Sequence, residues 1–251
     1  MSQNIKVDQG TTEMVYGEDS LMISELFYDT IQGEGVWTGT PAVFMRLSGC
    51  TLACAYCDSK QTWKSGGKFS HEQLLGMMQS FGIVERLSNG HHLVITGGSP
   101  LLQQTSLIRF LDRFRKRYKF TPFIEVENEC TIIPKARLLH MVSCWNNSPK
   151  LINSGNDMDI AYQPDVIGFM SKFSNSWFKF VISDENDYKE VEERYIRTGL
   201  VRKDRVLLMP MAADRHTLQE VQERVIEIAC FKNLRYCTRL QIEVWDVKRC
   251  V

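Results

Sequence analysis

Two hydrophobic periods alternate along this chain. Short apolar runs bounded by glycine, proline or polar residues are typical of buried strands, and apolar positions three or four residues apart are typical of helices that cover a sheet. The runs predict strands at residues 21–28, 43–47, 92–96, 122–127, 142–145, 177–182, 206–209 and 240–244. The helical spacing predicts helices at residues 71–87, 105–118, 133–141, 165–173, 184–197 and 215–230.

From residue 42 onward the predicted strands and helices alternate, which is typical of β-α units around a parallel sheet. A full barrel needs more units than this chain offers, so we predict an α/β fold, a partial (β/α)6 TIM-like barrel. We expect one domain over residues 21–251, preceded by a flexible extension at residues 1–20. In such folds the active site lies at the C-terminal ends of the strands.

Composition narrows the class of protein. The 30 basic residues balance 30 acidic ones, so no general attraction to nucleic acid is predicted. A hydrophobic content of 43% is enough to fill a substantial core. Residues 1–20 contain no apolar run, and no apolar stretch is long enough to span a membrane. We therefore expect a cytoplasmic protein without a signal peptide or membrane span.

The most informative stretch is the loop after the apolar run at residues 43–47. Cys50, Cys54 and Cys57 stand there at the spacing C-x3-C-x2-C. Three thiolates this close can bind the corners of one iron-sulfur cluster. A 4Fe-4S cluster normally takes four cysteines, yet the next one is Cys130, so one iron would be left to hold a small molecule. This arrangement resembles radical S-adenosylmethionine (SAM) enzymes, whose aromatic residue before the last cysteine is matched by Tyr56.

Other interpretations of the cysteines are a zinc site, three buried thiols and a non-enzymatic iron-sulfur module. A structural zinc site usually takes four ligands in two spaced pairs, and no second pair lies nearby. An electron-transfer module would be expected to supply the fourth cysteine and would not need a barrel-sized scaffold. The remaining cysteines are expected to be plain thiols. They are Cys130, Cys144, Cys230, Cys237 and Cys250.

Several further motifs carry a closer resemblance. They are Ile31-Gln32-Gly33-Glu34-Gly35, Arg46 before the first cysteine, Cys57-Asp58-Ser59, Thr96-Gly97-Gly98-Ser99-Pro100, Ser148-Pro149-Lys150, and the ending from Arg239-Leu240 through Trp245 to Val251. From about Phe27 to Val251 the chain resembles the 7-carboxy-7-deazaguanine synthase family. The resemblance implies a partial barrel of the radical SAM type.

The chain departs from the family pattern at three places. Ser99 replaces the glutamate of G-G-E-P, a carboxylate that can hold the SAM amino group. The usual E-T-N-G-T becomes Glu127-Asn128-Glu129-Cys130-Thr131, and Gln241 replaces a histidine. A charge-assisted hydrogen bond to the SAM ammonium is the stronger kind. We therefore expect another acidic group, Glu127 or Glu129, to compensate for Ser99.

The resemblance implies a radical SAM carbon-nitrogen lyase of 7-deazapurine (queuosine-type) biosynthesis. Its reaction converts 6-carboxy-5,6,7,8-tetrahydropterin to 7-carboxy-7-deazaguanine with loss of ammonia. The implied cofactors are a 4Fe-4S cluster, SAM and Mg2+. SAM and the cluster carry the radical chemistry, so no side chain is expected to act as a catalytic group. The resemblance implies that the cluster would supply one electron to SAM and that the radical so formed would take a hydrogen from the substrate.

The resemblance also assigns site residues. Cys50, Cys54 and Cys57 ligate the cluster, and Ser59 ligates Mg2+. The predicted SAM contacts are Tyr56, Cys57, Asp58, Gly98, Ser99, Glu127, Ser148, Pro149 and Lys150. The predicted substrate contacts are Ile31, Gln32, Gly33, Glu34, Arg46, Thr96 and Val251. Several alternatives stay open. Arg46 can instead form a structural ion pair, and Ser59 can be a loop cap. Tyr56 can be a core aromatic, and Gly97-Gly98 and Ser148-Pro149-Lys150 can be turns.

The implied partners are the small pterin substrate and a one-electron reductant such as flavodoxin or ferredoxin. The resemblance also implies a homodimer, without nucleic acid or membrane partners. A rival enzyme is a radical SAM activase that acts on a partner protein. Such an activase would share the cysteine loop but would not need the segment from Gln32 to Glu34. Turnover of a tetrahydropterin separates the two enzymes.

Overall fold

A computed structural model describes residues 4–6, 16–63, 66–248 and 250. Its strands are β1 (Asn4–Lys6), β2 (Ser20–Ile31), β3 (Pro41–Leu47), β4 (Gly67–Ser70), β5 (His92–Gly97), β6 (Ile124–Asn128), β7 (Cys144–Asn147), β8 (Ser176–Ile182), β9 (Val206–Pro210) and β10 (Arg235–Tyr236). Its α-helices are α1 (His71–Ser80), α2 (Ile83–Ser88), α3 (Gln104–Tyr118), α4 (Ala136–Met141), α5 (Met158–Ala161), α6 (Pro164–Met170), α7 (Glu185–Val191), α8 (Arg215–Lys232) and α9 (Leu240–Trp245).

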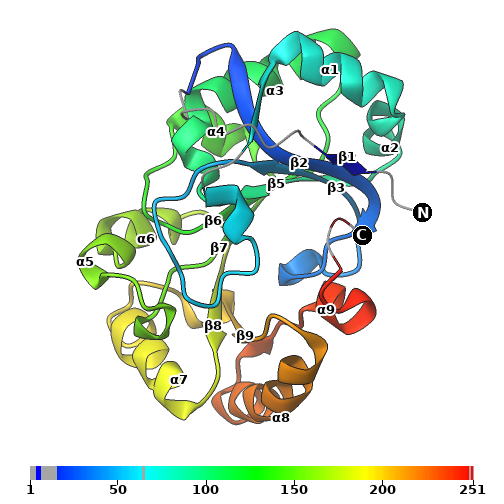
Figure 1. Ribbon diagram of the computed structural model, residues 1–251. Coiled ribbons are helices and arrows are strands. Elements are labelled where there is room, and N and C mark those ends of the chain that lie inside the picture. The colour runs from blue at the N-terminus through cyan, green and yellow to red at the C-terminus, as the bar shows by residue number, and fades with distance from the viewer. Residues whose placement is uncertain (1–3, 7–15, 64–65, 249, 251) are drawn as a thin grey trace.

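The strands form one mixed sheet in the order β1-β2-β3-β5-β6-β7-β8-β9-β10, with β4 paired to β2. From β3 to β10 the neighbouring strands are parallel, whereas β1, β3 and β4 are antiparallel to β2. The parallel order confirms the predicted β-α units. Helices lie along the outer side of the sheet, and the loop after β3 crosses in front of it (Figure 1).

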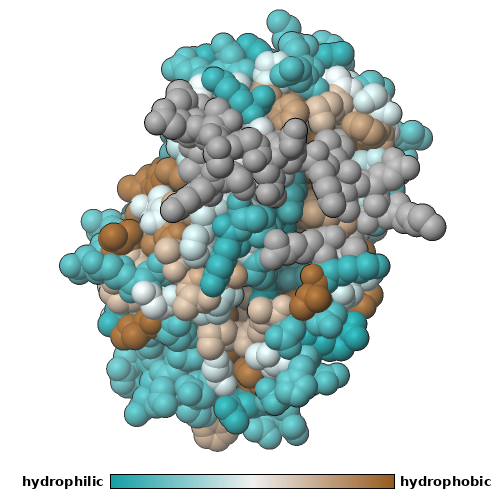
Figure 2. Space-filling model, in the orientation of Figure 1, coloured by the Kyte–Doolittle hydropathy of each residue, from teal (hydrophilic) through white to brown (hydrophobic). Residues whose placement is uncertain are grey.

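One continuous apolar core lies between the sheet and its helices. Its largest buried side chains include Trp145, Tyr195, Phe110 and Phe178. The strands contribute apolar side chains to this core, and they also carry buried polar side chains such as Glu125, Asn146 and Lys179. On the face shown in Figure 2, hydrophilic side chains dominate and apolar ones are scattered in small groups. Within the described ranges no helix has the length and apolar character to span a membrane.

Some predicted elements have different bounds. The predicted helix at residues 71–87 is two helices, because Gly82 adopts a left-handed conformation (φ 67°) between α1 and α2. The predicted helix at residues 184–197 begins as α7 and continues as a π-helix at Glu192–Ile196. Strand β2 is longer than expected and extends to Ile31.

The predicted strand at residues 240–244 is wrong, because these residues form α9. Apolar and polar residues alternate there, which suggested a strand, but only Ile242 of this helix is buried. The edge of β9 is already paired with β10, so no place beside β9 remains for another strand. Instead, the Leu240 backbone N–H donates to the Gly33 carbonyl at 2.9 Å and fixes α9 beside the loop after β2.

The predicted N-terminal extension contains an unexpected strand. Residues 4–6 form β1, which pairs with β2 in the register Asn4 to Phe27. These three residues are therefore paired with the sheet, and the flexibility of the extension stays a prediction. Residues 1–3 and 7–15 of the predicted extension lie outside the described residues.

Candidate functional site

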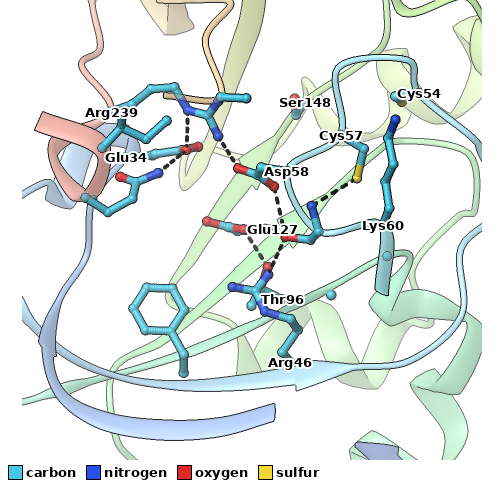
Figure 3. Close-up of a pocket in the computed structure, with 18 of the residues that line it drawn as sticks. Glu34, Arg46, Cys54, Cys57, Asp58, Lys60, Thr96, Glu127, Ser148 and Arg239 are labelled. Carbon is cyan, nitrogen blue, oxygen red and sulfur yellow. Dashed lines mark hydrogen bonds and ion pairs between the residues drawn. The ribbon is translucent and has the colours of Figure 1, made fainter. Parts of the chain in front are cut away.

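A cavity of about 500 Å³ lies at the C-terminal ends of the parallel strands. Its walls come from the loop after β3 and from residues at the ends of β5, β6 and β7, where the fold predicted an active site. Figure 3 shows side chains from these segments and from the C-terminal part of the chain pointing toward one another. This volume is in the range of small-molecule and cofactor sites.

Most of the predicted site residues line this one cavity. They are Ile31, Gln32, Gly33, Glu34, Arg46, Cys50, Cys54, Tyr56, Cys57, Asp58, Ser59, Thr96, Gly98, Glu127, Ser148 and Lys150. Ser99 and Pro149 are not in its lining, although Ser99 contacts a cysteine of the loop. Val251 lies outside the described residues.

Two glycines hold the end of β5 against the cysteine loop. A Cβ on Gly97 would collide with the Leu47 carbonyl, and one on Gly98 would collide with the Gly49 carbonyl. Gly97 also has a φ of 139°, which L side chains rarely adopt. Glycine is therefore needed at both positions so that two backbone segments of the chain can pack closely. A SAM contact at Gly98 stays a prediction.

All three sulfur atoms of the loop accept hydrogen bonds. The Leu52 N–H donates to Cys50 Sγ at 3.4 Å, and the Ser59 N–H donates to Cys57 Sγ at 3.4 Å. Asn156 Nδ2 donates to Cys54 Sγ at 3.1 Å, and Ser99 Oγ donates to Cys50 Sγ at 3.7 Å. Hydrogen bonds to sulfur accompany cluster thiolates and tune their reduction potential.

The thiol chemistry therefore fits an iron-sulfur cluster. Burial raises the pKa of the Cys50 and Cys57 thiols, so thiolates there need a positive partner such as cluster iron. In the described ranges, no three His, Cys, Asp or Glu side chains converge closely enough to hold a single metal ion. A cluster is larger than one ion, and its ligands stand further apart.

The opposite wall of the cavity is a buried ion-pair network centred on Glu34. Lys179 Nζ and Arg239 Nε both donate to the Glu34 carboxylate, the latter at 3.0 Å. Gln241 Nε2 donates to the same carboxylate at 2.7 Å. Arg239 also donates to Asp58, so the network reaches the end of the cysteine loop (Figure 3).

Electrostatics keep this network ionised. Burial alone would raise the pKa of Glu34, but Lys179 and Arg239 together hold it well below its usual value. Burial alone would lower the pKa of Lys179, but Glu34 raises it above its usual value. The Asp58 carboxyl likewise has a lowered pKa, because the attraction of Arg239 outweighs the opposing effect of partial desolvation.

Arg46 connects the floor of the cavity to the cysteine loop. Its Nε donates to Glu25 at 2.7 Å, so the structural ion pair that the sequence left open is present. Its Nη1 donates to Ser59 Oγ at 3.3 Å, and that hydroxyl donates to Asp58 at 2.8 Å. Arg46 nevertheless lines the cavity, where its guanidinium has donors beyond the two used here.

Gln32 belongs to a second buried network at the base of the cavity. Its Nε2 donates to Glu125 at 3.3 Å, and Glu125 also binds His92 Nδ1 at 2.7 Å and Asn146 Nδ2 at 2.7 Å. Gln32 Oε1 accepts from the Glu34 N–H at 3.2 Å. The side chain of Gln32 therefore has a structural role in holding the loop after β2.

Sequence reasoning missed several residues that shape the site. Lys179 and Asn156 were not predicted, and Arg239 and Gln241 were noted only as parts of the C-terminal pattern. Lys179 stands alone in the apolar strand β8 and is buried, and an isolated lysine in such a strand signals a buried partner. Asn156 lies in a loop and carried no comparable signal.

Comparisons with known proteins agree with this geometry. The family described as a 4Fe-4S single cluster domain matches residues 31–127. A 7-carboxy-7-deazaguanine synthase from Pyrobaculum aerophilum is 33% identical over 224 residues, covering 88% of this chain and 94% of that protein. A 7-carboxy-7-deazaguanine synthase from Halobacterium salinarum is 31% identical over 249 residues, covering 90% and 91%.

A solved structure supports the fold. The crystal structure of QueE from Escherichia coli matches with a TM-score of 0.63 at 24% identity, covering 88% of this chain and 94% of that one. The resemblance that the motifs indicated is thus confirmed over nearly the whole chain. The cysteine loop, the cavity beside it and these relatives lead to one conclusion: the chain belongs to the 7-carboxy-7-deazaguanine synthase family.

Proposed function

We propose that this chain is a radical SAM carbon-nitrogen lyase that converts 6-carboxy-5,6,7,8-tetrahydropterin to 7-carboxy-7-deazaguanine with loss of ammonia. The observation that carries the proposal is the pairing of two walls around one cavity. One wall presents three sulfur atoms that accept hydrogen bonds, and the other presents buried cations and carboxylates. The first suits a cluster, and the second suits a polar heterocycle that carries a carboxylate.

The cysteine loop would hold the cofactors. Cys50, Cys54 and Cys57 would ligate the 4Fe-4S cluster, which together with SAM supplies one-electron hydrogen-abstraction chemistry. The residues expected to bind and orient SAM lie in or next to the cavity lining. They are Tyr56, Cys57, Asp58, Gly98, Ser99, Glu127, Ser148, Pro149 and Lys150. Lys150 Nζ donates to Ser148 Oγ at 2.8 Å, which ties two of these groups together.

The remaining walls would bind the substrate. Arg46 would pair with the substrate carboxylate through its remaining guanidinium donors, because its Nε is held by Glu25. Ile31, Gln32, Gly33, Glu34 and Thr96 would surround the ring, with Val251 as a further contact. Glu34 is oriented by Lys179 and Arg239, and Thr96 Oγ1 donates to Glu127 at 2.6 Å. These contacts fix the side chains in advance, so less ordering is needed when the substrate binds.

Ser59 would contribute one oxygen to Mg2+. Its hydroxyl accepts from Arg46 and donates to Asp58, which leaves one lone pair on the oxygen. Asp58 lines the cavity next to it and offers a carboxylate, and oxygen is the donor that Mg2+ prefers. Ser59→Ala should then lose most of the Mg2+ dependence of turnover, whereas Ser59→Thr should keep it. Identical Mg2+ curves for Ser59→Ala and the parent would show that Ser59 is only a loop residue.

We also propose a barrel type, an oligomeric state, a cellular location and an electron donor for this enzyme. The parallel strands from β3 to β9 would form a partial (β/α)6 barrel of the radical SAM type, with the cavity at its C-terminal end. The enzyme would act as a homodimer in the cytoplasm, where reducing conditions preserve cluster thiolates. A one-electron donor such as flavodoxin or ferredoxin would reduce the cluster.

The test is turnover under anaerobic conditions. Cluster-loaded protein is incubated with SAM, reductant, Mg2+ and the carboxytetrahydropterin, and the ultraviolet spectrum is followed for a deazapurine. We expect the deazapurine spectrum with the parent protein and none with Cys57→Ala. Loss of SAM without a deazapurine would favour another radical SAM reaction and contradict the proposed substrate.

A further inference from the structure

Glu129 places an unsatisfied carboxylate oxygen in the cavity wall. The residue lines the cavity and is only 5% exposed. Its Oε1 accepts from Thr131 Oγ1 at 2.7 Å and from Thr51 Oγ1 at 3.4 Å, whereas its Oε2 is buried and has no hydrogen-bond partner in the described part of the chain. A buried carboxylate oxygen without a donor is costly, so this atom is suited to receive a donor from a bound molecule.

The other cavity carboxylates already have partners. Glu25 pairs with Arg46, and Glu34 and Asp58 pair with Arg239. Asp246 accepts a hydrogen bond from the Arg215 backbone N–H at 2.8 Å. Glu127 accepts from Thr96. Its charge adds to that of Glu25 in raising the pKa of Arg46 and to that of Glu34 in raising the pKa of Lys179, so it stands in the field of two cations.

Glu129 differs from these carboxylates. Among the described residues its recorded partners are hydroxyl groups, and no lysine or arginine there forms an ion pair with it. A cation from outside the chain would complete its environment. This favours Glu129 over Glu127 as the group that meets a positively charged part of a ligand.

Glu129 is also connected to the cysteine loop. Thr51 Oγ1, which donates to Glu129, lies 3.0 Å from Ser99 Oγ. Ser99 Oγ in turn donates to Cys50 Sγ at 3.7 Å. Ser99 is the residue that replaces the family glutamate, so the carboxylate that position 99 lacks is present two hydroxyl groups away.

We propose that Glu129 Oε2 accepts a hydrogen bond from the ammonium group of SAM and so replaces the carboxylate absent at Ser99. The proposal rests on the proposed function and assigns one contact within it. An ammonium has three N–H donors and a positive charge, which satisfy both the bonding capacity and the charge of the buried carboxylate. Ser99 then acts as a positioning residue that holds Thr51 and Cys50 in place.

The experiment compares two ligands on two proteins. Binding of SAM and of the SAM analogue that lacks the amino group is measured by anaerobic equilibrium dialysis with cluster-loaded parent and Glu129→Gln. We expect Glu129→Gln to bind SAM about 10- to 100-fold more weakly, as for a lost hydrogen bond to a charged group. The analogue should bind both proteins equally, and Glu127→Gln should weaken SAM binding less than Glu129→Gln does.

Two results would overturn the assignment: unchanged SAM affinity in Glu129→Gln, or equal weakening for SAM and the analogue. Should Glu129→Gln fail to fold, Glu129→Asp keeps the charge and shortens the side chain by one methylene. We expect Glu129→Asp to lose affinity for SAM only, and no difference from the parent would contradict the proposal. Parent protein that binds SAM but forms no deazapurine would overturn the proposed function and leave the assignment of Glu129 standing.

Discussion

The two walls of the cavity are built in opposite ways. The cysteine wall is local in sequence, since its three thiols lie within eight residues and are held by hydrogen bonds to sulfur. The Glu34 wall joins residues far apart in the chain, because Glu34 meets Lys179 across 145 residues and Arg239 across 205 residues. Its groups are charged and buried, and they satisfy one another.

The two walls therefore differ in what completes them. The thiols gain their full partners only when a cluster binds, so the cysteine wall is completed by its cofactor. The ions of the Glu34 wall are paired within the protein, so that wall has its shape before any ligand arrives. We expect changes in the first wall to alter cofactor properties, and changes in the second to alter the stability of the fold.

The largest effect should come from removing a cysteine of the loop. Cys54→Ala should abolish the cluster, because the remaining two thiols cannot hold it. Iron content and visible absorbance of anaerobically purified protein are the measurements. Cys230→Ala is the matched control, since Cys230 is exposed on α8 and lies outside the cavity lining. Full iron in Cys54→Ala, or zinc in place of iron in the parent, would contradict the cluster assignment.

The next effect concerns the Glu34 wall. Glu34→Gln leaves Lys179 buried without its counter-ion, and breaking a buried ion pair in this way typically costs about 3–5 kcal/mol of unfolding free energy. Denaturant unfolding measures the loss. Glu72→Gln is the control, because it breaks the exposed pair with Arg117, for which about 1 kcal/mol or less is expected. Similar losses in both variants would remove the distinction between the two kinds of ion pair.

Low pH should reduce the contribution of the Glu34 wall to the free energy of unfolding. The folded-state pKa of Glu34 lies below its usual value of 4.5, because Lys179 and Arg239 outweigh the effect of burial. Its contribution to stability is therefore fully present above that value and is lost as the pH falls through the folded-state pKa. The difference in unfolding free energy between the parent and Glu34→Gln should be constant near neutral pH and should shrink below about pH 4.5. A difference that does not change with pH would mean that Glu34 is not held ionised.

The smallest effect should come from the hydrogen bond to Cys54. Asn156→Asp keeps the acceptor for the Ala53 N–H but removes the donor to sulfur and adds a negative charge. The cluster potential should become more negative by on the order of 40 mV, the equivalent of one hydrogen bond of about 1 kcal/mol. Asn153→Asp is the control, because Asn153 donates to the Val181 carbonyl and not to a sulfur. Equal potentials in the parent and Asn156→Asp would contradict the role of this bond.

Sequence reasoning succeeded where the signal is local. Apolar runs predicted the parallel strands. The cysteine spacing with the neighbouring motifs predicted the family, and most of the site residues that it implied do line the cavity. The predictions failed where the structure depends on contacts between residues that are far apart in the sequence. Apolar alternation at residues 240–244 suggested a strand, but β10 already occupies the edge beside β9. Lys179 was visible as an isolated charge in an apolar strand, yet nothing local identifies Glu34 as its counter-ion.

The central claim is that the cysteine wall binds a cluster with one iron open to SAM. The most direct measurement is the electron paramagnetic resonance spectrum of the dithionite-reduced, cluster-loaded protein with and without SAM. We expect a 4Fe-4S signal whose g-values change when SAM is added, and a smaller change with the analogue that lacks the amino group. A reduced-cluster signal that is identical with and without saturating SAM would mean that no iron of the cluster is open to SAM.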